Sequence, residues 1–126
     1  MSVPRLSISQ ACFLHEAMTA ASGGGTGVRD AGLLDAALAG AFQTFGGEML
    51  YPDPAEQAAR VGFSLIANHP FVDGNKRIGT LVMLTLLELG GTPCRADDAA
   101  VVEMALSVAS GAWDYDRLLV WVRAHL

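Results

Sequence analysis

Apolar residues recur along most of the chain at the three- and four-residue spacing of amphipathic helices. These blocks predict helices over residues 11–21, 31–41, 54–68, 75–89 and 98–110, and a last one after Asp114. Polar residues that can cap a helix precede the blocks. Ser7 and Gln10 have the spacing of a capping box, and Asp30, Asp53 and Asp114 are expected N-caps.

The same spacing predicts which face of each helix is buried. In the first helix one stripe is expected to face inward, and it comprises Phe13, Leu14, Ala17, Met18 and Ala21. The helix over residues 75–89 is apolar nearly all round. This pattern is typical of a helix that other elements surround, so we expect it to be the central one.

Two stretches are predicted to lie outside helices. Residues 42–51 carry aromatic side chains around Gly46-Gly47, which predicts a short β-hairpin with a glycine turn. A two-stranded hairpin is not stable alone, so it should lie on the helices with one edge free. Residues 22–27 include three consecutive glycines. Such a run can form an anion-binding nest, but no strand precedes this one, so a flexible connector is expected. The predicted fold class is all-α, with about six helices and one short hairpin.

Length and composition predict one globular domain over residues 1–126, which buries about two-thirds of its surface. Hydrophobic residues make up 52% and charged residues 17%, which excludes a disordered chain. The net charge of −5 argues against a nucleic-acid partner and against an anionic membrane surface. The N-terminus has no signal-peptide pattern, and the longest apolar run, residues 78–89, is too short to span a bilayer. A soluble, cytoplasmic protein is expected.

Reactive side chains in most of the chain have simple structural interpretations. Cys12 and Cys94 stand among apolar residues and share no metal-binding spacing. Two buried free thiols in a reducing cytosol are expected, with one disulfide as the alternative. His15 is expected on the flank of a helix, and His125 in a terminal turn.

The densest chemistry lies directly before the most apolar helix. Gly74 permits a tight turn, and the first N–H groups of the following helix have no partner within that helix. Lys76 and Arg77 add two cations at this positive end, which implies an anion guest such as a phosphate. Asp73 is a carboxylate suited to Mg²⁺ beside phosphates, and His69 can take a proton from an attacking hydroxyl. These are the groups needed for phosphoryl or nucleotidyl transfer.

Each of these residues also has a simpler interpretation. His69 can cap the preceding helix, and Asp73 can close a turn. Lys76 and Arg77 can be solvated, although cations at a helix N-terminus oppose its dipole. His69 and Asp73 can also belong to a transition-metal site, but no third strong ligand is evident in the sequence.

The sequence HPFVDGNKR at residues 69–77 resembles the signature of the Fic/Doc superfamily, H-P-F-x-[D/E]-G-N-[G/K]-R. GVRDAGLL at residues 27–34, followed by the hairpin, is similar to the death-on-curing (Doc) branch, so the resemblance covers nearly the whole chain. It implies a helical Fic fold in which the motif loop lies between two central helices.

The resemblance also implies a role for each position of the motif. His69 would be the general base that activates a target hydroxyl, Asp73 would hold Mg²⁺, and Phe71 would anchor the loop in the core. Four residues would hold the nucleotide phosphates: Gly74, Asn75, Lys76 and Arg77.

The residue at position 76 distinguishes branches of this superfamily. Enzymes that transfer AMP usually have glycine there, whereas Doc-like members have lysine and bind the nucleotide in reversed orientation. For Lys76 the implied activity is a protein kinase, which transfers the γ-phosphate of ATP or another nucleoside triphosphate to a threonine of elongation factor Tu. AMP transfer to a protein hydroxyl is the alternative, and a catalytically silent binding module is the second.

Partners follow from the resemblance as well. Toxins of this branch arrest translation and are neutralised by an antitoxin, here expected to be Phd-like and to fold on binding. A self-inhibitory [S/T]-x-x-x-E-[G/N] helix is not found in the sequence, so restraint must come from a separate partner. The hairpin resembles a flap that aligns a target segment by strand addition. Its expected target-binding residues are Phe42, Thr44, Phe45, Gly46, Gly47 and Tyr51.

Overall fold

Six α-helices and one two-stranded hairpin make up the computed structural model of the chain, which describes residues 2–126. In chain order the elements are α1 (Ile8–Ser22), α2 (Ala31–Ala39), a 3₁₀ turn η1 (Gly40–Phe42), β1 (Thr44–Phe45), β2 (Glu48–Met49), α3 (Pro54–Asn68), α4 (Asn75–Leu89), α5 (Asp98–Ala109) and α6 (Tyr115–Ala124). The predicted all-α fold class is confirmed, and every predicted helix is found within a few residues of its expected bounds.

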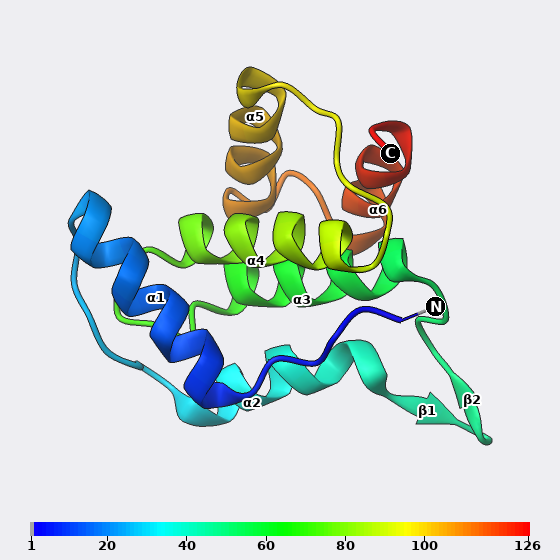
Figure 1. Cartoon of the computed structure of the whole chain (residues 1–126), viewed down its shortest axis with the longest axis horizontal. Helices are drawn as coiled ribbons and strands as arrows, with labels where there is room; N and C mark the ends of the chain where they lie inside the picture. Colours follow the sequence, from blue (N-terminus) through cyan, green and yellow to red (C-terminus); the bar gives the residue numbers. More distant parts are fainter. Residues whose placement is uncertain (1) are drawn as a thin grey trace.

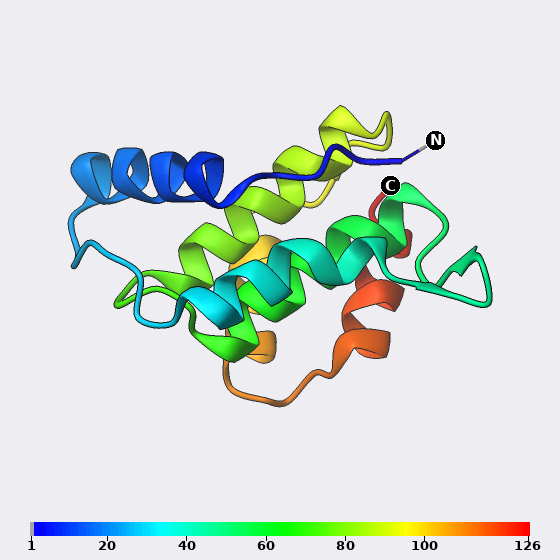
Figure 2. The ribbon, with the colours of Figure 1, turned by 90° about the horizontal axis from the view of Figure 1, so that it is seen from below.

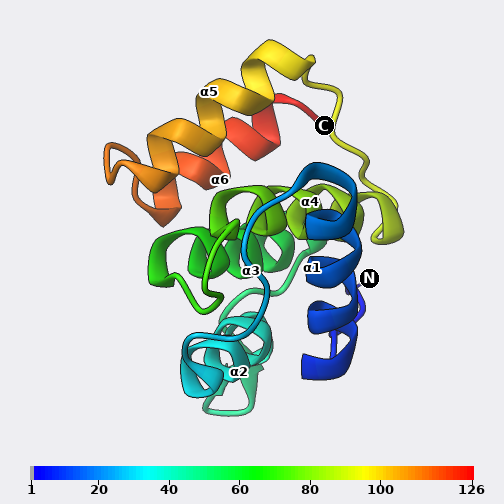
Figure 3. The same cartoon turned by 90° about the vertical axis from the view of Figure 1, so that its left-hand side faces the viewer.

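The helices are arranged around the pair α3 and α4, which lie side by side through the middle of the molecule (Figure 1). α5 and α6 pack on one side of this pair, and α2 lies on the other side. Seen from the end that carries the loop between α3 and α4, α1 lies beside α4 (Figure 3). The hairpin extends from the opposite end, where α3 begins (Figure 2).

Short polar side chains begin five of the helices, as the sequence pattern indicates. Ser7 and Gln10 form the reciprocal capping box of α1, with both hydrogen bonds present. Asp30, Asp53, Asp97 and Asp114 each accept a hydrogen bond from the backbone N–H three residues later. Each cap satisfies a donor that the helix itself leaves unpaired. α4 is the exception, because Gly74 precedes it and no side chain caps it.

Two glycines allow α3 and α4 to approach closely. A methyl group on Gly79 of α4 would lie 2.5 Å from Ile66 Cγ1 and 3.1 Å from the carbonyl oxygen of Gly62. A methyl group on Gly62 of α3 would lie 2.7 Å from Met83 Cβ. These distances are too short for real carbon contacts, so neither position accommodates a side chain without a shift of the helices.

The predicted buried stripe of α1 is only partly right, since Leu14 and Met18 are half-buried against the core. Phe13, another member of the stripe, is 70% exposed, and the buried residues of α1 are Ala11, His15 and Thr19. The hydroxyl of Thr19 donates to the carbonyl of Glu16, so this polar group is satisfied inside the protein. The most buried face of α1 therefore differs from the apolar stripe and carries one apolar and two polar residues.

The expectation that residues 75–89 form the central helix is only partly right. Leu81 and Leu89 of α4 are 41% and 60% exposed. α3 contacts α2, η1, α4, α5 and α6, so it has the most neighbours of the helices described. Its small residues Ala58, Ala59 and Gly62 let these neighbours approach from several sides, and small residues contribute little to an apolar pattern.

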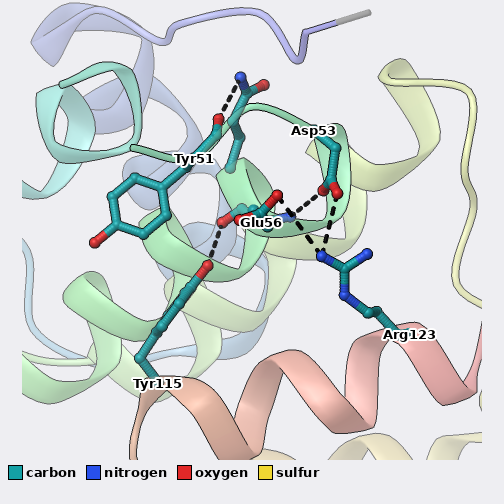
Figure 4. A network of polar contacts seen from close by, with 6 residues as sticks. Tyr51, Asp53, Glu56, Tyr115 and Arg123 are labelled. Atoms are coloured by element: carbon teal, nitrogen blue, oxygen red, sulfur yellow. Dashed lines mark hydrogen bonds and ion pairs between the residues drawn. The ribbon is translucent and has the colours of Figure 1, made fainter. Parts of the chain in front are cut away.

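The hairpin has the predicted glycine turn and is attached to the beginning of α3. Thr44 pairs with Met49, and Gly46 and Gly47 have φ values of 60° and 84°, as a tight hairpin turn requires. Beside its exit, the rings of Tyr51 and Tyr115 meet edge to face at 5.4 Å (Figure 4).

Polar contacts then connect α6 to the first turn of α3 (Figure 4). The Tyr115 hydroxyl donates to the carbonyl of Glu56 at 3.0 Å, and burial raises the pKa of that hydroxyl far above its usual value. Arg123 Nη2 lies 3.1 Å from Asp53 Oδ2 and 3.6 Å from Glu56 Oε1. These contacts fix the end of α3 that carries the hairpin.

Both cysteines are free thiols and half-buried, so the disulfide alternative is excluded for Cys12 and Cys94. Within residues 2–126, no helix combines the length and the apolar character that a membrane span needs.

We expect Gly79→Ala to destabilise the protein by about 1–3 kcal/mol, although alanine favours helix formation, because the added methyl group forces α3 and α4 apart. Urea unfolding followed by circular dichroism measures the change. Thr85→Ala, on the exposed side of the same helix, is the matched control and should change little. An unchanged or increased stability of Gly79→Ala would contradict the close crossing.

Candidate active site

The loop between α3 and α4 reverses the chain with two left-handed residues. His69 ends α3 with φ 51° and ψ 55°, and Gly74 precedes α4 with φ 74°. Glycine adopts this conformation freely, whereas histidine does so only at a cost. Within residues 2–126, His69 is the one non-glycine residue with positive φ.

All predicted site residues of the motif except the buried Phe71 border one surface hollow of about 390 Å³. Its lining residues are His69, Val72, Asp73, Gly74, Asn75, Lys76 and Arg77. The His69 side chain is exposed and makes no hydrogen bond within the described part of the chain. The structure therefore brings the base, the carboxylate and the cations of the sequence analysis to one place.

Asn75 holds the loop in shape with its side chain. Its amide oxygen accepts from the Phe71 N–H at 2.9 Å, and its amide nitrogen donates to the Phe71 carbonyl at 3.0 Å. The side chain is buried and satisfied by these two bonds. Because the side chain is used in these bonds, only the backbone N–H of Asn75 is left for the expected phosphate contact.

His15 was expected on a helix flank, and this prediction is wrong. The residue is 1% exposed, and its ring stacks on the buried ring of Phe71, with centroids 4.0 Å apart and planes at 3°. His15 Nε2 donates to the carbonyl oxygen of Asp73 at 2.8 Å. Since a carbonyl can only accept, Nε2 must carry a proton. His15 thus fixes the loop on both sides of Val72, and only the folded chain brings it there.

Asp73 is held by two backbone donors. The N–H of Gly25 bonds to its Oδ2 at 3.1 Å, and the N–H of Gly74 bonds to its Oδ1 at 2.8 Å. These two donors, in that order, hold the pKa of Asp73 below its usual value, and the charge of Arg77 contributes in the same direction. The carboxylate is fully exposed and ionised at neutral pH, with lone pairs free for a further ligand.

The beginning of α4 has unused donors. Among residues 2–126, no acceptor takes the backbone N–H groups of Asn75, Lys76 and Arg77, and no side chain caps the helix. No carboxylate in the described part of the chain forms an ion pair with Lys76. The guanidinium of Arg77 donates to the hydroxyl of Ser22 and to the carbonyl of Gly23. Three free N–H groups, the helix dipole and two cations are the features that a phosphate-binding helix end needs.

Residues 23–29 connect α1 to α2 without a helix or strand, as expected of a connector, and they also lie along the loop. Val28 forms an antiparallel bridge with Phe71, and the N–H of Val72 donates to the carbonyl of Gly27 at 3.0 Å. A methyl group on Gly24, which has φ 110°, would lie 2.9 Å from Arg77 Nη2. The glycines therefore allow the backbone of residues 23–29 to approach the candidate site closely. They also allow the chain to change direction.

Arg29, which sequence reasoning did not single out, contacts the other end of the loop. Its Nε donates to the carbonyl of His69 at 2.6 Å, and its Nη2 donates to the carbonyl of Asn68 at 2.9 Å. Only its place in GVRDAGLL, directly before the cap of α2, distinguishes it in the sequence.

The hairpin is not beside the loop, which corrects the expectation that it holds a target segment against His69. It precedes α3, and the loop follows α3, a helix of 15 residues. At 1.5 Å per residue the two lie about 22 Å apart, and Figure 1 shows them at opposite ends of the molecule. Phe45 at its tip is 80% exposed. The segment that borders the loop is residues 23–29 instead.

An apolar groove of about 470 Å³ adjoins the beginning of α4 and lies between α1, α4 and α5. Lys76 and Arg77 line both the groove and the hollow. The other lining residues are Met18, Thr80, Leu81, Leu84, Val101, Val102, Ala105 and Leu106.

Comparisons with known proteins agree with the motif. The model of the Fic/DOC family matches residues 5–87, which include α1 to α3 and most of α4. Toxin Doc of Mycolicibacterium smegmatis (strain ATCC 700084 / mc(2)155) is 42% identical over 86 residues. The aligned part is 66% of this chain and 66% of that relative.

We expect His15→Phe to lower stability by about 1–3 kcal/mol, because the new ring keeps the stacking on Phe71 but leaves the Asp73 carbonyl without its donor. Urea unfolding measures the loss. His125→Phe, which removes a histidine from the last turn of the chain, is the comparison and should cost less. Equal stability of His15→Phe and the wild-type protein would show that the hydrogen bond does not support the loop.

Proposed function

The chain belongs to the Fic/DOC family, and from this we propose that it transfers the γ-phosphate of a nucleoside triphosphate, such as ATP, to a hydroxyl group of a protein. The observation that carries the proposal is the uncapped beginning of α4, with three free N–H groups, beside His69 and Asp73. A bare helix N-terminus with two cations is a site for phosphate groups.

The residues of the hollow supply the steps of such a transfer. An imidazole nitrogen of His69 takes the proton of the target hydroxyl, whose oxygen then forms a bond to the terminal phosphorus. The bond from that phosphorus to the bridging oxygen breaks, and the nucleoside diphosphate leaves. The N–H groups of residues 75–77 and the side chains of Lys76 and Arg77 hold the phosphates while charge moves to the leaving group.

Asp73 fits a magnesium ion shared with phosphate oxygens. It is exposed and ionised, and each of its oxygens retains a free lone pair. No cluster of three or more His, Cys, Asp or Glu side chains exists in residues 2–126, so the ion would take most of its ligands from phosphates and water, as Mg²⁺ commonly does. Bound there, Mg²⁺ would neutralise part of the phosphate charge.

Lys76 favours the γ-phosphate over the AMP group as the part that is transferred. In the Fic/Doc superfamily, which the motif resembles, members with lysine at this position bind the nucleotide in reversed orientation. Its ammonium group lines the hollow and is free of any carboxylate within the described residues. AMP transfer is the competing outcome of the experiment below.

The relative's printed name, Toxin Doc, supports the proposal that this chain is a toxin of a toxin–antitoxin pair. We propose that it arrests translation by modifying a threonine of elongation factor Tu. A Phd-like antitoxin that folds on binding would neutralise it, and the apolar groove beside Lys76 and Arg77 offers such a segment a surface next to the phosphates.

Label transfer from ATP tests the proposal. With purified elongation factor Tu and Mg²⁺, we expect label on protein from γ-labelled ATP and none from α-labelled ATP. The reverse pattern would establish AMP transfer instead. No label from either nucleotide, on this target or in a ribosome-free extract, would exclude both activities and favour a binding module.

His69→Ala should lower the transfer rate by about 10²–10⁴-fold, because a general base contributes about that much. Nucleotide affinity, measured by calorimetry, should stay the same because the phosphate site lies on α4. His125→Ala is the matched histidine control. A full transfer rate in His69→Ala would remove His69 from the role of base, and growth arrest that survives the change would favour the binding module.

A further inference from the structure

Arg29 donates three hydrogen bonds to the backbone around His69, and the N–H of Asp30 donates a fourth, to the carbonyl of Pro70 at 3.0 Å. The side chain of Arg29 donates to the carbonyls of Asn68 and His69, at 2.9 and 2.6 Å, and its backbone N–H donates to the carbonyl of Pro70 at 2.8 Å. Three consecutive carbonyls therefore accept hydrogen bonds from one residue that lies 40 positions earlier in the chain.

The conformation at His69 needs this support. A left-handed non-glycine residue costs about 1–2 kcal/mol, and Pro70 disfavours a return of His69 to the right-handed helix. The last carbonyls of α3 have no partners in the helix and carry its negative partial charge. The guanidinium of Arg29 satisfies two of them with charge-assisted bonds from two nitrogens of its planar fork.

The imidazole of His69 has no support of its own. It is exposed and bonds to nothing among residues 2–126, so its position over the hollow depends on the backbone that carries it. Among residues 2–126 no carboxylate forms an ion pair with Arg29, and its Nε and Nη2 both donate to this backbone. The phosphate half of the site has separate supports, namely His15 at Asp73 and Asn75 at Phe71.

We propose that Arg29 is the positioning residue for His69. It holds the end of α3 in the left-handed conformation that directs the imidazole toward the hollow, and it does not contact the nucleotide. The catalytic consequence rests on the proposed function, since it assumes that His69 acts as the base.

Kinetics of Arg29 variants test this role. Arg29→Ala should lower kcat by about 10–100-fold, because small misplacements of a catalytic group have effects of this size. The KM for the nucleotide should change little. Arg29→Lys keeps the charge but loses the two-nitrogen geometry of the guanidinium, so its kcat should be nearly as low as that of Arg29→Ala. Millimolar guanidinium ion, far below denaturing concentration, should restore part of the kcat of Arg29→Ala. Arg95→Ala, which removes an exposed arginine distant in sequence from the loop, is the matched control.

A double mutant separates positioning from a general loss of structure. If Arg29 acts through His69, Arg29→Ala should add little to the loss already caused by His69→Ala, because the two residues act as a unit. The same fold-loss in both backgrounds would overturn the proposal, and so would an unchanged kcat or a full rate in Arg29→Lys.

A spectroscopic readout keeps the test independent of activity. In Arg29→Ala the ring-proton resonances of His69 should shift and those of His125 should not, and amide exchange of residues 71–72 should become faster. Unchanged His69 resonances would overturn the proposal on Arg29. If the wild-type protein transfers no label, the proposed function fails, and the resonances alone then decide whether Arg29 positions His69.

Discussion

The close crossing of α3 and α4 determines the geometry on which the site depends. Gly62 and Gly79 leave no room for a side chain between the two helices, so the end of α3 and the beginning of α4 are fixed relative to each other. Residues 69–74 must connect these two points. A short connection between fixed ends needs left-handed residues, and the chain uses one histidine and one glycine there. The strain at His69 is thus a consequence of helix packing.

Local signals made much of the fold predictable. Ser7 with Gln10, Asp30, Asp53 and Asp114 act on the donors within three residues of them, so the beginnings of their helices can be read directly from the sequence. The hairpin was equally predictable from the sequence, because Gly46 and Gly47 can adopt the conformation of a tight turn without help from other segments. The candidate chemistry of residues 69–77 is also local, since one short segment carries an imidazole, a carboxylate and two cations.

What the sequence did not reveal depends on contacts between distant segments. His15 of α1 is buried with its ring hydrogen-bonded to a carbonyl in the loop, and helical periodicity does not indicate such a partner. The sequence predicts that Arg29 and the glycines before it belong to a linker, because their contacts with the loop exist only in the tertiary structure. The place of the hairpin was misjudged for the same reason: its strands are local, but its distance from the loop is set by the length of α3.

The supports of the loop also determine when during folding the site can exist. His15 and Arg29 lie 58 and 40 residues before their partners, so each contact closes a long segment of chain. Such contacts are entropically costly and form only when the helices between them have packed. A fragment spanning α3 and α4 would carry the complete motif without either support. On the ribosome, the N-terminal supports are synthesised first, and the loop over residues 69–74 becomes ordered only with the tertiary structure.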